Sequence, residues 1–411
     1  MNLVMYAIPF FIVLMALEYV YGRARGRNTY RLADTVNSLS LGTLSRLTGL
    51  VKLGLAGMVF EFVRARLGLA TLSAESWGLW ALAFVGYDFC YYWSHRYGHQ
   101  WKLFWAAHVA HHQSEEFNLS TALRQTSTGA TFVFYVPLYL LGFPTEMIVT
   151  VGALNLIYQF WVHTEHVPSL GPVEWLLVTP SNHRVHHAKN PGYVDRNYGG
   201  VFIVWDRLFG TFTAERAAEP CVYGITHPLG SWNPLWANAH VWLETARDTV
   251  RTRRLRDKVH LWFSSPGWRP ADLPPRQHDW RAPKYDPPMA PGAGVLTFVQ
   301  YWLVTAASLT LLVLADGLPY SLTLSGVTLL AFSFYVQGTF LEGRGYAVRL
   351  ELVRLALLAA ATAWWQPTLG PASTAILFGY AAASLVAVAW LHLMRPETSR
   401  TRPVEWTSPT N

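Results

Sequence analysis

Long hydrophobic runs alternate with polar stretches along most of this chain. The most apolar runs cover residues 2–20, 295–315, 318–341, 350–365 and 372–393. A helix needs about 20 predominantly apolar residues to cross the hydrocarbon core of a bilayer. The pattern therefore predicts membrane-spanning helices at both ends of the chain.

Weaker hydrophobic runs lie between these two regions. They cover residues 39–63, 77–93, 130–143 and 147–162. Arg46 and Lys52 fall inside the first of them, so a re-entrant or interfacial segment competes there with a full span. The last two runs are short and are separated by Gly142 and Pro144, which favours a hairpin that leaves one membrane face and returns to it.

The arginines indicate how the spans are oriented. Residues 2–20 are followed by Arg23, Arg25, Arg27 and Arg31, so the charge comes after the apolar run, unlike in a signal peptide. Basic loops stay in the cytoplasm, which places the N-terminus outside. Continuing across the later spans puts a second set of arginines in the cytoplasm as well: Arg344, Arg349, Arg354, Arg395, Arg400 and Arg402.

Composition narrows the class of protein. Of the 411 residues, 52% are hydrophobic, which is typical of a polytopic membrane protein rather than of soluble domains. Cys90 and Cys221 are too few for a disulfide framework. The basic stretch 247–258 fits anionic lipid headgroups better than nucleic acid. Gly-rich phosphate loops, GxSxG and HExxH motifs are absent from the sequence, which argues against dinucleotide-binding oxidoreductases, serine hydrolases and zincins.

Three histidine clusters carry the candidate chemistry. Their members are His95 and His99, then His108, His111 and His112, and finally His183, His186 and His187. On helices, residues three and four apart project from one face, so each cluster offers convergent imidazoles. A single buried histidine is usually structural, but eight in repeated spacing exceed the needs of one four-coordinate ion. The spacing predicts two metal ions.

Two acidic residues lie close to these clusters. Asp88 precedes His95 by seven residues, about two helical turns, and either orients a histidine or is a polar group at the helix end. Glu165 is the carboxylate embedded among the histidines. Soluble di-iron bundles bridge their metals with carboxylates, but this set is almost entirely imidazole, so we expect Glu165 to orient a ligand rather than to bridge metals.

The chain has the motifs HxxxH, HxxHH and HxxHH in this order. In this it resembles the fatty acid hydroxylase and sterol desaturase superfamily of membrane di-iron enzymes, and the resemblance covers about residues 88–212. QFWVHTEHV at 159–167 and TPSNHRVHHAKN at 179–190 are similar to the alkylglycerol monooxygenase branch. NLSTALRQT at 118–126 and RNYGG at 196–200 are also similar to this branch.

The resemblance implies a ligand set and its supporting residues. In the family pattern an additional histidine joins the metal ligands, and His163 matches it, whereas His166 is either a tenth ligand or a hydrogen-bonding group at the interface. The implied ligands of two irons are His95, His99, His108, His111, His112, His163, His183, His186 and His187. The residues implied to orient them are Asp88, Asn118, Glu165, Asn182 and Asn197.

The same resemblance implies a reaction and its partners. O₂ would hydroxylate or desaturate a lipid C–H bond, with an ether lipid preferred and a sterol or fatty acyl chain as the alternative. The implied external electron donor is tetrahydrobiopterin, or a ferredoxin or cytochrome-type chain. A metal transporter or metal-storing protein is the alternative of another class. Its ligands should lie within the membrane spans or in flexible histidine-rich tracts, whereas here they lie at helix ends in regular spacing.

These inferences define an all-α polytopic membrane protein with a cytoplasmic, histidine-rich metal-binding cap, in a bacterial inner membrane or an ER-type membrane. Four regions are expected: an N-terminal anchor region at 1–76, a hydroxylase-like di-iron domain at 77–215, a basic and proline-rich segment at 216–294, and a four-helix membrane region at 295–411.

Overall fold

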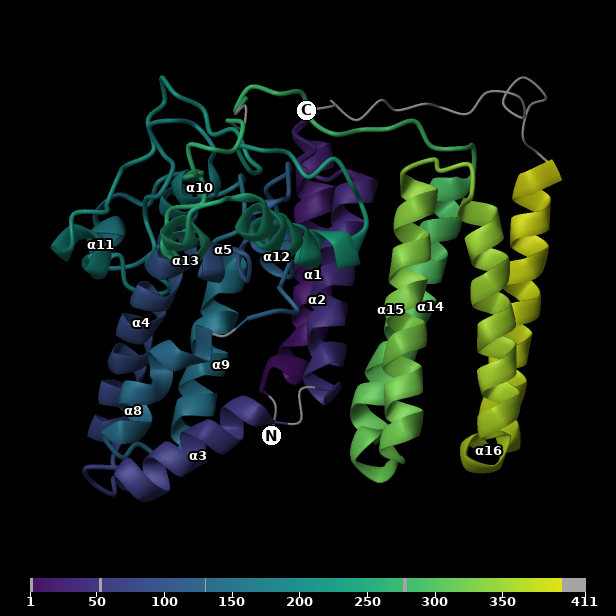
Figure 1. Ribbon diagram of the computed structural model, residues 1–411, viewed down its shortest axis with the longest axis horizontal. Coiled ribbons are helices and arrows are strands. Elements are labelled where there is room, and N and C mark those ends of the chain that lie inside the picture. The colour runs from purple at the N-terminus through teal and green to yellow at the C-terminus, as the bar shows by residue number, and fades with distance from the viewer. Residues whose placement is uncertain (1–2, 52–53, 130, 276–278, 394–411) are drawn as a thin grey trace. The chain divides into compact units, whose positions relative to one another are not determined.

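The computed structural model describes all residues except 1–2, 52–53, 130, 276–278 and 394–411 (Figure 1). The described residues contain helices and two isolated β-bridges but no strand, which confirms the all-α prediction. Lys52, Arg395, Arg400 and Arg402 lie outside the described residues. The chain forms two compact units: the first unit contains Met1–Ser45, Lys52–Leu229 and Ala237–Lys284, and the second unit contains Arg46–Val51, Gly230–Trp236 and Tyr285–Asn411.

The first unit has a helical stem. Its elements are α1 (Leu3–Ala24), α2 (Leu32–Val51, as far as residue 45), α3 (Leu55–Leu67), α4 (Trp77–Gln100), the 3₁₀ helix η1 (Thr131–Tyr135), α8 (Val136–Leu140) and α9 (Thr145–Trp161). Within this stem α9 packs against both α4 and α1. The run at 147–162 therefore forms a helix close to its expected bounds.

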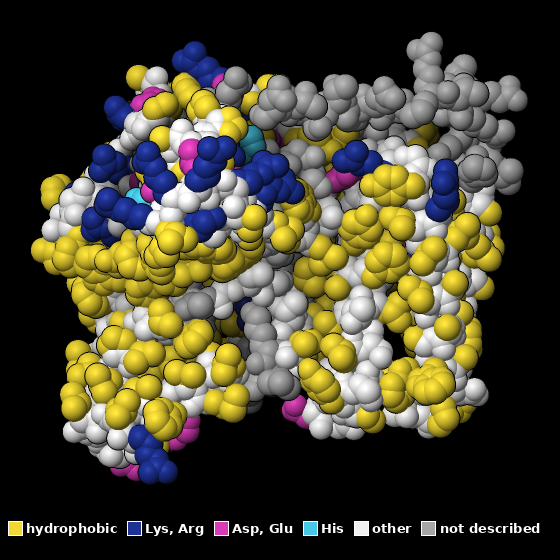
Figure 2. Space-filling model, in the orientation of Figure 1, with side chains coloured by type: hydrophobic (Ala, Val, Ile, Leu, Met, Phe, Trp, Pro, Cys, Tyr) yellow, Lys and Arg dark blue, Asp and Glu magenta, His cyan; other side chains and the backbone are white. Residues whose placement is uncertain are grey.

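A cap of short helices and loops lies at one end of the stem (Figure 1). Its elements are α5 (Lys102–Trp105), α6 (Val109–His112), α7 (Leu119–Ala122), the 3₁₀ helix η2 (Gly171–Trp175), α10 (Pro180–His187), α11 (Val204–Leu208), α12 (Pro234–Arg251, from residue 237) and α13 (Leu255–Phe263). In Figure 2 hydrophobic side chains cover much of the visible stem surface, while Lys and Arg side chains gather over the cap. This distribution is what a bilayer around the stem requires.

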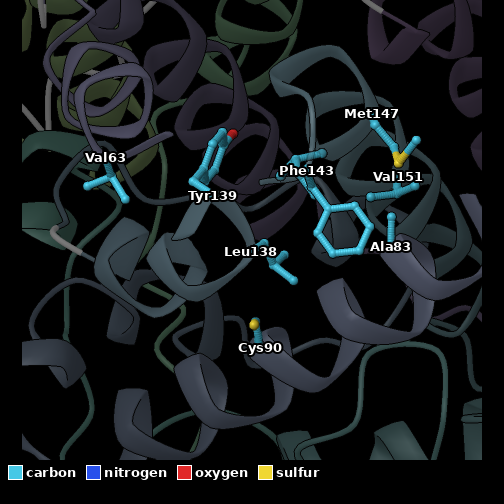
Figure 3. Close-up of a cluster of buried hydrophobic side chains, with 9 residues drawn as sticks. Val63, Ala83, Cys90, Leu138, Tyr139, Phe143, Met147 and Val151 are labelled. Carbon is cyan, nitrogen blue, oxygen red and sulfur yellow. The ribbon is translucent and has the colours of Figure 1, made fainter. Parts of the chain in front are cut away.

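Apolar side chains from α3, α4, α8 and α9 form a hydrophobic core within the stem (Figure 3). Met147 and Val151 of α9 lie beside Ala83 of α4, and all three are almost completely buried. Cys90 is a free, buried thiol within this cluster. Its surroundings are those of a packing residue.

Two weak runs do not form single helices. Gly54 has a left-handed backbone (φ 65°) that suits glycine, and it separates α2 from α3 inside the run at 39–63. Figure 1 shows α3 running across the end of the stem rather than along it, and it packs against α8. In the run at 130–143, a 3₁₀ helix precedes the one-turn helix α8.

The second unit is dominated by long apolar helices: α14 (Ala293–Leu314), the short 3₁₀ helix η3 (Ala315–Gly317), α15 (Tyr320–Leu341) and α16 (Ala347–Leu393). Gly370 interrupts α16 with a non-helical backbone and is flanked by Pro367 and Pro371, so α16 consists of two arms. In the described residues, four helices are long and apolar enough to cross a membrane: α1, α14 with η3, α15 and α16. The chain is a polytopic membrane protein.

Candidate metal centre

The structure brings nine histidines together as two neighbouring groups. The first histidine group contains His95, His99, His108, His112 and His186, and the second contains His111, His163, His183 and His187. Within each group, one nitrogen from every ring lies within 4.8 Å of the corresponding nitrogens of the others. These nine are the residues expected from the sequence.

Helix geometry explains how each HxxHH sequence serves both groups. In the sequence at 108–112, His108 and His112 are four apart and join the first group, while His111 turns to the second. In the sequence at 183–187 the division is reversed. His186 joins the first group, while His183 and His187, which are four apart, join the second. Successive residues on a helix are rotated by about 100°, so adjacent histidines diverge while those four apart converge.

The spacing between ring nitrogens fits a metal ion. In the first group, Nε2 of His108 lies 3.1 Å from Nε2 of His95 and 3.0 Å from Nε2 of His112. In the second, Nε2 of His183 lies 2.9 Å from that of His163 and 3.1 Å from that of His187. Two ligands bound at about 2.1 Å and subtending roughly 90–110° at one ion are separated by about 3.0–3.4 Å. The donor set therefore fits a metal in each group.

Backbone carbonyls fix the orientation of several rings. His111 Nδ1 lies 2.9 Å from the carbonyl of Arg124, and His163 Nδ1 lies 2.7 Å from that of Gln159. A carbonyl only accepts hydrogen bonds, so each Nδ1 carries the proton and each neutral ring presents its Nε2 lone pair. These two Nε2 atoms face each other at 3.4 Å. Two lone pairs at that distance need a cation or a proton between them.

The same arrangement recurs in the first group. His95 Nδ1 is 2.8 Å from the carbonyl of Tyr198, and His186 Nδ1 is 2.9 Å from that of Arg196. Both carbonyls belong to the loop containing RNYGG. This loop therefore holds rings from two different helices in register.

Burial keeps these imidazoles neutral. Desolvation, followed by repulsion from neighbouring histidines, lowers the pKa of His112 and of His186 well below the usual range. Burial is also the main cause that lowers the pKa of His111, to about 4. A neutral imidazole has a free lone pair, which is the form that binds a metal ion.

Asp88 acts on the loop rather than on a ring. Its carboxylate accepts hydrogen bonds from the backbone N–H groups of Val201 (2.8 Å) and Phe202 (3.0 Å), from Trp205 Nε1 (3.0 Å) and from Asn155 Nδ2 (2.7 Å). Val201 and Phe202 come a few residues after Arg196 and Tyr198, whose carbonyls hold His186 and His95. Asp88 is thus tied to the histidine groups through the backbone.

The three asparagines stabilise helix starts and loops of the cap, and two of them support α10, which carries three of the histidines. Asn118 caps α7, and its Nδ2 donates to the carbonyl of Thr29 at 2.6 Å. Asn182 forms a capping box with Thr179 at the start of α10. Asn197 has a left-handed backbone (φ 55°), and its Nδ2 donates to the carbonyl of Asn182 at 2.9 Å. This last bond joins the RNYGG loop to α10.

Glu165 and His166 lie outside both histidine groups. The Glu165 carboxylate is about a quarter exposed and lies 3.5 Å from the guanidinium of Arg27. The His166 ring meets Tyr21 edge-on, with 5.3 Å between ring centroids. Both residues contact the segment around the end of α1.

Sequence reasoning missed the role of Arg124. Its side chain is 1% exposed and donates from Nε to the carbonyl of Ala110 at 2.6 Å, while its own carbonyl accepts from His111. Burial lowers its pKa to about 10. Arg124 lies within NLSTALRQT, so the motif was visible, but a charged residue gives no sign in the sequence that it will be buried.

The chain is similar to known lipid-oxidising proteins over the part that contains the histidines. The fatty acid hydroxylase family model matches residues 80–211. The chain is 35% identical to alkylglycerol monooxygenase from Danio rerio, over 86% of this chain and 80% of that protein. It is 42% identical to the Homo sapiens alkylglycerol monooxygenase, over 64% of this chain and 59% of that protein. An ornithine lipid hydroxylase from Rhizobium tropici is 29% identical over 48% of this chain and 62% of that protein. No solved structure matches the chain.

Proposed function

The chain belongs to the alkylglycerol monooxygenase family, and from this premise we propose that it is a di-iron oxygenase acting on an ether-linked glycerolipid. Family membership makes it a membrane oxidoreductase that acts on a lipid. The number of irons, the substrate and the electron donor are the parts that we propose.

The observation that carries the proposal is the division of nine buried histidines into two groups of ring nitrogens. We assign one iron to each group, with His95, His99, His108, His112 and His186 as ligands of one and His111, His163, His183 and His187 as ligands of the other. Bound iron would supply the reduction of O₂ and the removal of hydrogen from an unreactive C–H bond.

The protein's own groups prepare the centre for this chemistry. Carbonyls of Tyr198, Arg124, Gln159 and Arg196 hold Nδ1 protons, so the opposite nitrogens are available at neutral pH. Phe117 is fully buried, and its ring centroid lies 5.2 Å from that of His187. Such apolar packing keeps bulk water away from the centre.

The proposed substrate follows from depth in the membrane. The histidines lie where the stem meets the cap, so a lipid held in the surrounding leaflet would present carbons near its headgroup. In an alkylglycerol, the carbon beside the ether oxygen has that position. One oxygen atom of O₂ enters its C–H bond, and the other leaves as water after taking two electrons and two protons. The resulting hemiacetal collapses to an aldehyde and free glycerol.

Tetrahydrobiopterin is the proposed source of the two electrons, and a ferredoxin or cytochrome-type chain is the alternative donor. A sterol or fatty acyl substrate is the alternative for the lipid. The family match argues against the metal-transport alternative.

Substrate and donor are tested together. Membranes containing the protein are incubated with an alkylglycerol, a sterol or a fatty acid, each with tetrahydrobiopterin or with a ferredoxin system. We expect pterin-dependent aldehyde release from the alkylglycerol alone, abolished in His186→Ala and retained in His166→Ala, the matched histidine outside both groups. Sterol or acyl oxidation without aldehyde would move the assignment to the alternative substrate.

We also propose that the cap faces the cytoplasm of a bacterial inner membrane or an ER-type membrane, because Arg23, Arg25 and Arg27 lie at or just after the end of α1 and Arg27 lies 3.5 Å from Glu165 of the cap. Single cysteines at Val194, in the cap, and at Leu69, after α3, separate the two sides. In intact cells a membrane-impermeant thiol reagent should label Leu69→Cys and spare Val194→Cys. The reverse pattern would overturn this orientation.

A further inference from the structure

One face of α13 exposes an apolar stripe. Leu255, Val259 and Phe263 are spaced four residues apart and are 79%, 64% and 47% exposed. The buried face of the same helix is a different one, since Leu261 has no exposed surface. A cap helix in water would present polar residues on its outer face. An apolar stripe of this kind is typical of a helix that lies at a membrane interface.

Neighbouring cap elements also expose large apolar side chains. Val250 near the end of α12 is 80% exposed, Leu208 of α11 67% and Trp175 of η2 68%. Figure 2 shows a band of hydrophobic side chains across the first unit at about the level of α11, α12 and α13, with Lys and Arg side chains gathered directly above it. Hydrophobic side chains also cover much of the stem surface below this band (Figure 2).

Arginines are concentrated at the turn between α12 and α13. The exposed members are Arg247, Arg251, Arg253, Arg254 and Arg256. Asp248 is turned inward and pairs with Arg269 at 2.9 Å. Asp272 accepts hydrogen bonds from the Thr252 hydroxyl and the Arg253 backbone N–H. The exposed surface of this turn is therefore strongly positive.

We infer that α13 and the end of α12 lie in the membrane interface, with the stripe among the acyl chains and the arginines on anionic phospholipid headgroups. Apolar insertion beside a basic flank is the chemistry of interfacial helices, and anionic lipids supply the complementary charge. The apolar stem surface below the band and the Lys and Arg side chains above it favour a lipid leaflet, rather than a protein partner, as what covers the stripe. This inference rests on the membrane location alone, so its failure leaves the proposed oxygenase reaction untouched.

Nitroxide labels on the stripe and on the basic turn before α13 test the insertion. Val259→Cys places a label on the stripe, and Arg253→Cys places one on the exposed turn, in full-length protein reconstituted in bilayers. The unsubstituted protein, labelled in parallel, gives the background from Cys90 and Cys221. The Val259 label should collide several-fold more with O₂ than with a water-soluble nickel chelate, and the Arg253 label should show the reverse. Access to nickel at position 259 would mean that water covers the stripe, and low access to both reagents would mean a protein partner or second copy; either result overturns the inference.

Lipid retention tests the charge. Phosphatidylglycerol carried through purification from mixed phosphatidylcholine bilayers is counted by native mass spectrometry for wild type and for Arg251→Gln with Arg254→Gln. Each charge removed should weaken retention about fivefold. Arg216→Gln is the control, because Arg216 is exposed but already paired with Glu219 at 2.9 Å. Equal retention in all three proteins would overturn the assignment of anionic headgroups.

Discussion

Both units bury polar side chains between apolar helices, but they satisfy them differently. In the second unit, Arg354 donates from Nε and Nη2 to the Glu351 carboxylate at 2.7 and 2.6 Å, and Gln300 donates to the same carboxylate at 2.8 Å. In the first unit, the Nε2 atoms of His111 and His163 face each other without a proton to share. Burial alone therefore does not identify a functional site. The distinguishing feature is whether the buried groups neutralise one another or together require an additional ion.

The largest expected effect comes from removing a histidine of the first group. His108→Ala should lower iron from about two per chain to below one and reduce lipid oxidation at least about 100-fold, because His108 lies within 3.1 Å of two other ring nitrogens. Metal analysis of protein purified with iron supplied measures the first effect. Glu351→Gln in the second unit is the control and should keep its iron. A single zinc per chain, unchanged in His108→Ala, would contradict the two-iron proposal.

The second unit should respond through stability instead. Glu351→Ala leaves the Arg354 guanidinium buried without its carboxylate, which should destabilise the fold by about 3–5 kcal/mol. Replacing both residues, as Glu351→Leu with Arg354→Met, should recover most of that loss. Thermal denaturation in detergent measures both variants. If the double variant were no more stable than Glu351→Ala, the pair would have a role beyond mutual neutralisation.

A smaller effect is expected at the RNYGG loop. Asn197→Ala removes the Nδ2 bonds to Asn182 and Thr213 and places alanine at φ 55°, where asparagine is favoured. We expect a loss of about 1–3 kcal/mol and an iron affinity about 10–100-fold lower, because the loop positions His95 and His186. Chelator competition measures the affinity. Asn197→Asp, which keeps the backbone preference and the acceptor, should be intermediate; unaltered affinity in both would mean that the loop is held without this amide.

The smallest effect is expected at His166. His166→Ala should keep both irons and change activity less than about twofold, since the ring lies outside both groups and packs on Tyr21. Iron content and aldehyde release measure this. Loss of one iron would make His166 a ligand that the present geometry does not include.

Helical spacing indicated the eight clustered histidines as ligands, whereas His163 was expected only from the family resemblance. It did not predict how they divide, since spacing along one helix does not determine which histidines of the two HxxHH sequences lie in the same group. The sequence also could not predict which backbone carbonyls orient the histidine rings. Every residue has a carbonyl, and only the folded structure brings those of Tyr198 and Arg124 next to His95 and His111. The left-handed backbone at Gly54, which separates α2 from α3, was also not recognised, because this glycine lies inside an apolar run.

The sharing of each HxxHH sequence between the two groups has a consequence for how the centre fills. An ion in the first group would draw His108, His112 and His186 into place, and the same helical turns would then align His111, His183 and His187. On the proposed assignment, occupancy by the first ion prepays the ordering entropy of the second. Iron titration of the apoprotein should therefore be sigmoidal, with the singly loaded form scarce throughout.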